Sequence, residues 1–211
     1  MIFVSGTPSD DTQEQLVILD DAALREHLLA LPEAWTGPDE LRTAAVLAPI
    51  FRRLNEDWLL LTQRRADLPH HPGQISFPGG QRDNQESPLE CALRECQEEI
   101  GQEPSKVLVL GALLPRRSSS DFHVQPIVGR IPDPVGLQPD PREVTSILAV
   151  PLRELLEENR WENREHTTPE RSYRETPHFD HGDHTIWGLT GRFTTELLAA
   201  IRASLKASGH D

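Results

Sequence analysis

Residues 80–102 read GQRDNQESPLECALRECQEEIGQ, and this stretch decides both the fold and the chemistry. Ser87 is a suitable N-cap, and Pro88 fits the first helical position. Glu90 completes an S-x-x-E capping box with Ser87. The pattern therefore predicts a glycine turn followed by a helix that runs from about Pro88 to Ile100.

The two faces of this helix differ in character. The apolar face consists of Leu89, Leu93, Cys96 and Ile100. Glu95, Glu98 and Glu99 lie on another face, as neighbours three and four residues apart. Arg94 can offset Glu98, but no Lys or Arg lies three or four residues from Glu95 or Glu99. Each like-charge pair costs roughly 0.2–0.5 kcal/mol, a cost that a bound divalent cation would reverse. A solvated acidic face is the alternative.

Seven residues of the stretch fit the spacing G-x5-E-x7-R-E-x2-E-E-x-G. They are Gly80, Glu86, Arg94, Glu95, Glu98, Glu99 and Gly101. The stretch thus resembles the Nudix hydrolase motif at all of its fixed positions. The resemblance implies an α/β fold, a Nudix α/β/α sandwich with a mixed β-sheet. One departure is Gln102, where Nudix proteins usually carry an aliphatic residue. We expect this departure to alter packing at the helix end without removing a metal ligand.

A second motif lies just upstream, in residues 60–80, which read LLTQRRADLPHHPGQISFPGG. It resembles the extra motif of the coenzyme A diphosphatase branch of Nudix hydrolases, roughly L-T-x-R-S, L-R-x-H-x-G-Q and F-P-G-G. Arg65 stands where that branch usually has a small residue, and Pro69 where it usually has an arginine. The missing arginine could remove a contact to a substrate phosphate, for which Arg65 is a candidate replacement. Looser matches extend the resemblance over about residues 40–200.

The chemistry of pyrophosphate hydrolysis suggests roles for the acidic residues. Divalent metals neutralise the phosphates and orient the attacking water, and Mg²⁺ or Mn²⁺ prefers oxygen ligands. We expect Glu95 and Glu99 to be the first metal ligands, with Glu98 close behind. Two carboxylates are candidates for the general base, Glu98 and the more distant Glu143.

The family resemblance adds further site residues. It implies that the carbonyl oxygen of Gly80 is a metal ligand. It also implies that Glu86 fixes the motif loop with Arg94 as its partner, and we group Arg94 with the catalytic residues. Gly79 belongs to the structural support of the site. The substrate-binding candidates are Arg64, His71 and Gln74.

The composition of the chain limits the classes of protein and of partner that the function can involve. The 211 residues suffice for one domain with a sizeable core, and 36% apolar with 26% charged residues suits a globular protein. The net charge of −13 argues against nucleic-acid partners and against adsorption to anionic membranes. Cys91 and Cys96 sit five apart in one helix and cannot form a disulfide there, which favours a reduced, cytoplasmic setting. The sequence shows neither a signal peptide nor a membrane span, and a homodimer is compatible with it.

The chain divides into an N-terminal extension with one helix (1–39), a Nudix domain (40–205) and a short tail (206–211). Helices are expected at 20–31, 88–100, 151–158 and 193–205. Strands are expected at 42–53, 58–64, 74–77, 106–114, 122–130, 144–150, 161–166, 172–179 and 185–188, with a polar turn at 55–57. Residues 131–142 are expected to form an ordered proline-rich loop. His178, His181 and His184 show H-x2-H-x2-H spacing, which favours a solvated loop over a metal site.

The leading hypothesis is metal-dependent hydrolysis of the pyrophosphate of coenzyme A or acyl-CoA. The resemblance implies 3′,5′-ADP and 4′-phosphopantetheine, or its acyl form, as products. An alternative is the same chemistry on another nucleoside diphosphate derivative, such as ADP-ribose, NADH or a dinucleotide polyphosphate. A non-catalytic nucleotide-binding module is a further alternative, although such a module is expected to lose the metal carboxylates that this chain retains.

Overall fold

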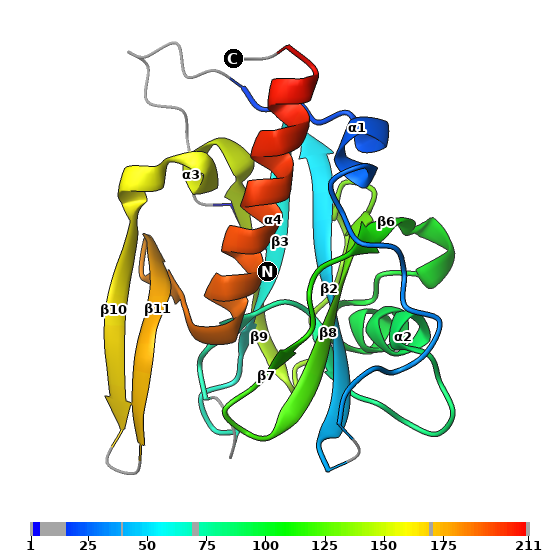
Figure 1. The fold of residues 1–211 in the computed structure, drawn as a ribbon, viewed down its shortest axis with the longest axis vertical. Coiled ribbons are helices and arrows are strands. Elements are labelled where there is room, and N and C mark those ends of the chain that lie inside the picture. The colour runs from blue at the N-terminus through cyan, green and yellow to red at the C-terminus, as the bar shows by residue number, and fades with distance from the viewer. Residues whose placement is uncertain (1, 5–15, 39, 69–71, 169–170, 210–211) are drawn as a thin grey trace.

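The computed structural model describes residues 2–4, 16–38, 40–68, 72–168 and 171–209. Within these residues the chain forms a large mixed sheet with helices on both faces, and a small second sheet beside it (Figure 1). The strands of the large sheet are β1 (Ile2–Val4), β2 (Arg42–Arg53), β3 (Glu56–Arg64), β4 (Ile75–Ser76), β5 (Gly79–Gln81), β6 (Leu108–Ala112), β7 (Arg116–Arg117), β8 (Phe122–Arg130) and β9 (Val144–Pro151). The helices are α1 (Asp21–Arg25), α2 (Pro88–Ile100), α3 (Leu152–Leu156) and α4 (Gly188–Ala207), with 3-10 turns at Pro104–Lys106 and Glu158–Arg160.

The main strands follow the order β1-β9-β3-β2-β8-β6. β2 runs parallel to β8 and antiparallel to β3, and β1 runs parallel to β9. The short strands β4, β5 and β7 pair with β3, β2 and β8 respectively. The sheet is therefore mixed, as the sequence predicts.

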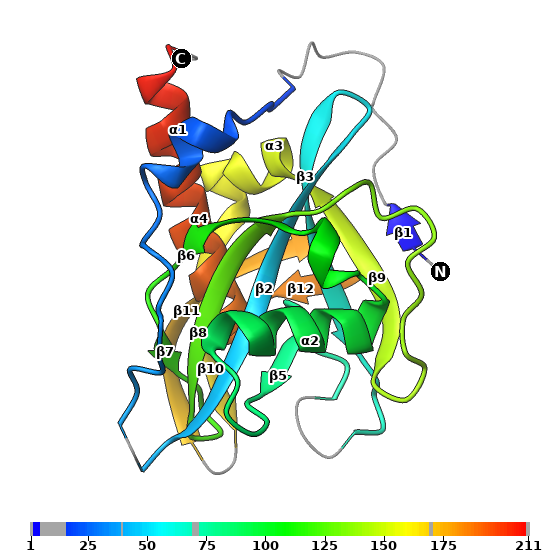
Figure 2. The same ribbon diagram turned by 90° about the vertical axis from the view of Figure 1, so that its right-hand side faces the viewer.

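Both faces of the central strands are buried, and alternate side chains of β3 show this. Leu59 and Leu61 belong to an apolar cluster that includes residues of α4. Trp58 and Leu60 belong to a second cluster that includes residues of α2. Because successive side chains of a strand point to opposite faces, α2 and α4 lie on opposite sides of the sheet (Figure 2). The predicted α/β/α sandwich is confirmed.

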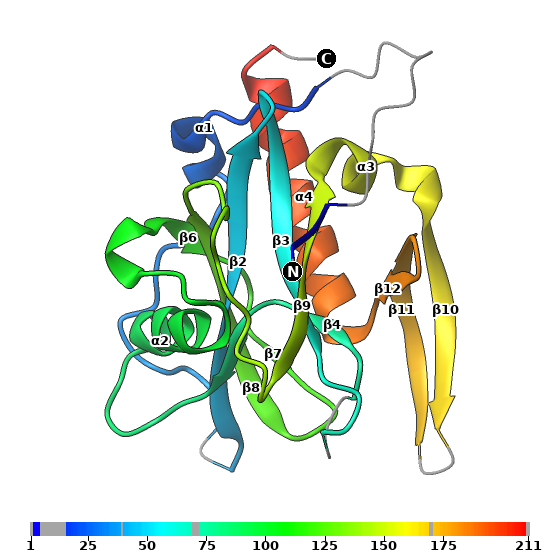
Figure 3. The same cartoon turned by 180° about the vertical axis from the view of Figure 1, so that it is seen from behind.

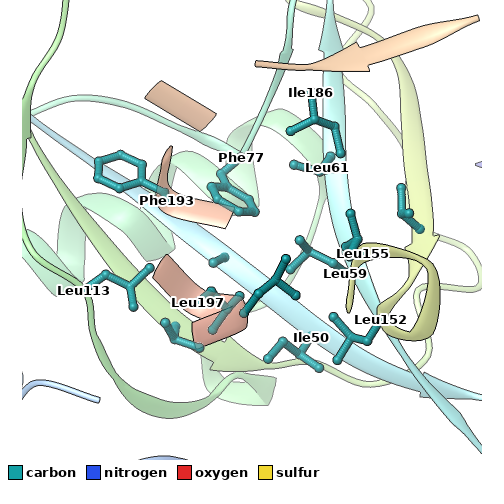
Figure 4. Close-up of a cluster of buried hydrophobic side chains, with 14 of the residues drawn as sticks. Ile50, Leu59, Leu61, Phe77, Leu113, Leu152, Leu155, Ile186, Phe193 and Leu197 are labelled. Carbon is teal, nitrogen blue, oxygen red and sulfur yellow. The ribbon is translucent and has the colours of Figure 1, made fainter. Parts of the chain in front are cut away.

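The cluster on the α4 side supplies much of the core. Figure 4 shows Leu197 of α4 together with Ile50 of β2 and Leu59 of β3, all three fully buried. Full burial of one such side chain stabilises the fold by about 1.5–3 kcal/mol. This packing holds β2 and β3 rigidly, and these are the strands from which the candidate site is built.

The small sheet consists of β10 (Trp161–Thr168), β11 (Arg171–His181) and β12 (His184–Ile186), all antiparallel. It lies beside α4, away from α2 (Figure 3). The predicted strands at 161–166, 172–179 and 185–188 are each present with shifted ends. Phe179 and Ile186 join the core on the α4 side, which fixes the small sheet to the main body.

Three predicted helices differ in length from the observed ones, and one of them is α3, which spans Leu152–Leu156 instead of residues 151–158. The N-terminal helix begins after its Asp20 cap but ends at Arg25, not at residue 31. It ends early because the backbone of Leu29 pairs with that of Ala112 by two hydrogen bonds of 2.9 Å. The C-terminal helix begins at Gly188, five residues earlier than predicted, and ends at Ala207.

The turn between β2 and β3 lies one or two residues before the predicted position. Leu54 and Asn55 both have left-handed backbone angles, with φ of 51° and 60°, as in a two-residue hairpin turn. Glu56 and Asp57 are consequently part of β3 and are buried. Polar character at these positions therefore reflects buried ion pairs and not a solvated turn.

Asp57 is the centre of one of these ion-pair clusters. Its carboxylate accepts hydrogen bonds from the guanidinium groups of Arg52 at 2.9 Å and Arg130 at 2.8 Å, and from the amide of Leu19 at 2.7 Å. Burial alone would raise the pKa of Asp57, but these hydrogen bonds outweigh it and hold the pKa below its usual 3.8. The cluster joins the segment before α1 to the sheet.

Asp57→Asn should lower the free energy of unfolding by about 3 kcal/mol near neutral pH, because two guanidinium groups lose their buried counter-charge. Because the pKa of Asp57 is lowered in the folded state, its stabilisation is complete above the usual pKa of 3.8 and is lost as pH falls through the folded value. Urea unfolding from neutral to acidic pH measures this difference. A gap between wild type and variant that stayed constant below the folded pKa would contradict the assignment.

Candidate metal site and active site

The orientation of α2 follows from local signals at both of its ends. Ser87 accepts a hydrogen bond from the amide of Glu90, and Glu90 accepts one from the amide of Ser87, so the predicted capping box is present. Gly101 ends the helix in the left-handed region, with φ of 76°. Cys91 and Cys96 are fully buried against the sheet as free thiols. This packing turns Glu95 and Glu99 towards β5.

The residues read as a glycine turn form the short strand β5, which corrects that prediction. A Cβ atom on Gly79 would lie 2.4 Å from the carbonyl oxygen of Ala45, and φ at Gly79 is 157°. A Cβ atom on Gly80 would lie 2.4 Å from Oε2 of Glu95. Gly79 is therefore required for this strand to pair with β2, and Gly80 leaves room for the Glu95 carboxylate in its present position.

Two partly or fully buried carboxylates face this glycine strand. Oε2 of Glu99 accepts a hydrogen bond of 3.2 Å from the amide of Gly79, and Oε1 lies 3.8 Å from Nη1 of Arg64. Burial raises the pKa of Glu99 to about 8, against the opposing effects of Arg64 and the Gly79 amide. Burial also raises the pKa of Glu95, partly offset by Arg94. Both carboxylates are therefore poorly compensated, and a nearby cation would stabilise their ionised forms.

Arg94 connects the acidic residues. Its guanidinium donates two hydrogen bonds to Glu86, of 2.9 and 2.7 Å, and one each to Glu95 at 2.8 Å and Glu98 at 3.0 Å. The predicted pairing of Arg94 with Glu86 and Glu98 is present. The contact to Glu95 does not follow from the sequence, because helix periodicity pairs residues three and four apart and not adjacent ones. The hydrogen bonds from Arg94 hold the pKa of Glu86 at about 2.

The two candidates for the general base occupy different positions. Glu98 has a side chain that is 61% exposed and accepts a hydrogen bond from Arg94. Glu143 is exposed and raises the pKa of both Glu95 and Glu99 through its charge. The loop before Glu143 is docked on the end of α2, since the amide of Asp140 donates to the carbonyl of Glu99 at 2.8 Å. The proline-rich segment is therefore an ordered loop, as predicted.

The substrate-binding candidates lie at the end of β3 and in the loop that follows. The amide of Arg64 donates to the carbonyl of Gln74 at 3.0 Å, which closes this loop beside Glu99. Within the described residues, buried Nε of Arg64 has no hydrogen-bond partner. Arg65, proposed above as a replacement phosphate contact, instead binds Asp67 and the carbonyl of Pro141. His71 and Pro69 lie outside the described residues.

The donor set fits a hard divalent cation. Within the described part of the chain, no three His, Cys, Asp or Glu side chains lie close enough to enclose a metal ion by themselves. Glu95, Glu99 and the Gly80 carbonyl offer only oxygen atoms, and the two glycines leave no side chain between strand and carboxylates. Mg²⁺ commonly keeps several waters and binds through one or two carboxylates together with substrate phosphates. The residues present are suited to such an open site.

The three histidines do not gather around an ion. Nδ1 of His178 lies 2.8 Å from the carbonyl oxygen of Thr176, and Nδ1 of His181 lies 3.1 Å from Oε2 of Glu154. His178 and His181 are also buried, so the predicted solvated loop is wrong. These two histidines satisfy their polar atoms within the small sheet and its surroundings.

Gln102, which stands where the motif usually has an aliphatic residue, is accommodated in the structure. It is buried at the end of α2, and its side-chain amide donates to the carbonyl of Glu103 at 3.1 Å. A polar side chain is accommodated there because its amide finds a backbone acceptor, while the acidic face of α2 keeps its position.

A family model of the NUDIX domain matches residues 41–170, more than half of the chain. The chain belongs to the Nudix family. It is 36% identical over 188 residues to a Photorhabdus laumondii protein named uncharacterized Nudix hydrolase NudL, covering 89% of this chain and 100% of that protein. A Yersinia enterocolitica protein of the same name is 48% identical over 119 residues, or 56% of this chain and 60% of that one. Among solved structures, the Nudix hydrolase RenU from M. smegmatis has 22% identity and a TM-score of 0.45, over 52% of this chain and 70% of that one.

Family membership makes the chain a Nudix pyrophosphohydrolase that acts on a nucleoside diphosphate derivative. Nudix hydrolases generally use divalent metal ions such as Mg²⁺ or Mn²⁺. Among the described residues, the structure contains no helix with the length and apolar character that a membrane crossing requires.

Glu99→Gln should abolish most metal binding and reduce turnover at least ~100-fold, because even residues that only support a metal ligand cost 10–100-fold. Since burial of the Glu99 carboxylate raises its pKa, the neutral amide should leave the metal-free protein as stable as wild type or more so. Mn²⁺ titration, turnover and thermal unfolding measure the three effects. Glu103→Gln, on an exposed residue just beyond α2, is the matched control. Near-normal turnover of Glu99→Gln would remove Glu99 from the ligand set.

Proposed function

We propose that the chain hydrolyses the pyrophosphate bond of coenzyme A or acyl-CoA in a metal-dependent reaction. The products are 3′,5′-ADP and 4′-phosphopantetheine, or its acyl form. The observation that carries this proposal is the approach of Arg64 Nη1 to 3.8 Å from Glu99 Oε1. Arg64 belongs to the segment that resembles the coenzyme A diphosphatase motif, and Glu99 belongs to the Nudix helix. The contact supports the view that both motifs serve one site.

A bound Mg²⁺ or Mn²⁺ would neutralise the two phosphates and lower the pKa of the attacking water. Glu95, Glu99 and the Gly80 carbonyl would hold the ion, while Arg94 keeps Glu95 in place through a hydrogen bond of 2.8 Å. Water attacks one phosphorus atom, its proton passes to a carboxylate base, and the bridging P–O bond breaks. The electron pair of that bond leaves with the second phosphate.

We assign the proton-accepting role to Glu143 in preference to Glu98. The Glu98 carboxylate accepts a hydrogen bond from Arg94 at 3.0 Å, so it is already engaged within the protein. The charge of Glu143 acts on both Glu95 and Glu99, which supports a role close to these two carboxylates. The loop before Glu143 is docked on the end of α2.

Substrate choice is assigned to the loop between β3 and β4. The guanidinium of Arg64 is partly exposed, which makes it suited to contact a phosphate. Gln74 lies beside it at the end of the same loop. The commitment of Arg65 to Asp67 and to Pro141 removes it as a replacement for the arginine missing at Pro69. Within the segment that resembles the coenzyme A diphosphatase motif, His71 is the remaining candidate for contact with the substrate.

The composition of the chain supports the partner class and the cellular compartment that we propose. A formal net charge of −13 disfavours nucleic-acid partners and anionic membranes, so the partner is a small nucleotide substrate. Two buried free thiols support a cytoplasmic setting. A homodimer is compatible with this assignment.

The proposal is tested with a hydrolysis panel in Mg²⁺ and in Mn²⁺, with identification of products. The panel contains coenzyme A, an acyl-CoA, ADP-ribose, NADH and a diadenosine polyphosphate. We expect kcat/KM for coenzyme A or its acyl form to exceed that for the others by at least about tenfold, because a site built to pair polar groups rejects analogues that lack them. Faster turnover of ADP-ribose would overturn the substrate assignment and leave the Nudix activity intact.

Glu143→Gln should lower kcat by about 100-fold at saturating Mn²⁺, since a positioned general base typically contributes 10²–10⁴-fold. Glu98→Gln, measured under the same conditions, should lower kcat less. Both variants keep the shape of the side chain and remove its negative charge together with its capacity to accept a proton. Unchanged kcat in Glu143→Gln, or a larger loss in Glu98→Gln, would transfer the role to Glu98.

A further inference from the structure

Residues 32–38 run between α1 and β2 and pass alongside α2 (Figure 2). We call this segment the strap and residues 82–86 the motif loop. Nε1 of Trp35 in the strap donates a hydrogen bond of 2.8 Å to the carbonyl oxygen of Glu86 in the motif loop. The strap therefore contacts the Nudix motif, although Trp35 precedes Glu86 by 51 residues in the chain.

Trp35 also contacts the other end of the motif loop. The guanidinium of Arg82 lies over the Trp35 ring, 5.6 Å from its centroid, which is within the range of a cation–π contact. The Trp35 ring packs against the apolar cluster that includes α2. One aromatic side chain thus holds the first and last residues of the motif loop against the helix.

The strap approaches the sheet closely two residues after Trp35. A Cβ atom on Gly37 would lie 2.6 Å from Cγ of the His123 ring, so only glycine fits this close approach to β8. His123 is part of β8, whose side chains pack on both sides of the rigid sheet. Trp35 is consequently carried by a segment whose backbone lies closely against the sheet.

On its inner side the motif loop is held by Arg94. Its Nη2 donates to the carbonyl of Gln81 at 3.0 Å and to Glu86 at 2.7 Å, while its Nη1 donates to Glu95 at 2.8 Å. The motif loop is therefore held between Trp35 outside and Arg94 inside. A displacement of Glu86 would move Arg94, and Arg94 in turn orients a carboxylate of the candidate metal site.

We propose that Trp35 is a positioning residue of the Nudix reaction, acting through Glu86 and Arg94 on the metal carboxylates. The inference rests on the hydrolytic activity of the site and does not depend on the choice of substrate. Trp35 would touch neither the substrate nor the metal ion. Its loss should therefore lower kcat and metal affinity while leaving KM for the pyrophosphate substrate unchanged.

The test compares Trp35→Phe with wild type. This change keeps a ring for packing and for Arg82 and removes the indole N–H. The matched control is Trp161→Phe, because Nε1 of Trp161 also donates to a backbone carbonyl at 2.8 Å, that of Leu155, on the opposite side of the sheet. We measure kcat, KM, Mn²⁺ affinity by electron paramagnetic resonance, and thermal unfolding for all three proteins.

We expect Trp35→Phe to lower kcat and Mn²⁺ affinity by about 3–10-fold, the size of one lost hydrogen bond, with KM unchanged. Trp161→Phe should lower only the unfolding temperature. Equal effects of the two variants on kcat, or a Trp35→Phe variant that loses stability alone, would overturn the proposal. If wild type cleaves no substrate in the panel, the proposed substrate fails, whereas the Mn²⁺ comparison still decides the role of Trp35.

Discussion

The guanidinium of Arg94 is the constraint on which the candidate site depends. Its five donors reach Glu86, Glu95, Glu98 and the carbonyl of Gln81, so that one cation joins the motif loop to the acidic face of α2. A row of carboxylates on one helical face would otherwise repel and splay apart. A lysine could supply the charge but not the planar fork that binds several oxygens in fixed directions. The catalytic helix is thus prepared for a metal by an internal cation placed beside it.

The pKa values separate two kinds of carboxylate within this row. Hydrogen bonds from Arg94 hold the pKa of Glu86 at about 2, so its negative charge is already neutralised within the protein. Burial raises the pKa of Glu99 to about 8, although Arg64 and the Gly79 amide oppose the rise. A group that is compensated gains little from a further cation, whereas a group that is buried without compensation gains much. This difference supports a structural role for Glu86 and a ligand role for Glu99.

Much of the scaffold could be predicted because its signals are local. The bounds of α2, β2 and β8 agree with the sequence, since a capping box and continuous apolar runs mark them. The sequence predicts a turn that includes Asp57, whereas Asp57 is buried in β3. Its burial depends on Arg130, which is 73 residues away. Long-range partners also explain the early end of α1 and the contact between Trp35 and Glu86. The carboxylate ligand candidates and their partner Arg94 could be predicted from one helix, but the contacts from the Gly79 amide to Glu99 and from Trp35 to Glu86 could not.

The central strand β3 links metal chemistry to substrate choice. Leu59 and Leu61 pack on one side and Leu60 on the other, so the strand cannot shift without disturbing both halves of the core. Its last residue is Arg64, which faces Glu99 and closes the following loop through Gln74. The loop can therefore change its sequence, as Pro69 illustrates, while Arg64 stays in register with α2. In the proposed function, a rigid strand followed by a loop of different sequence would separate specificity from catalysis, so that one pyrophosphatase scaffold could serve different nucleotides.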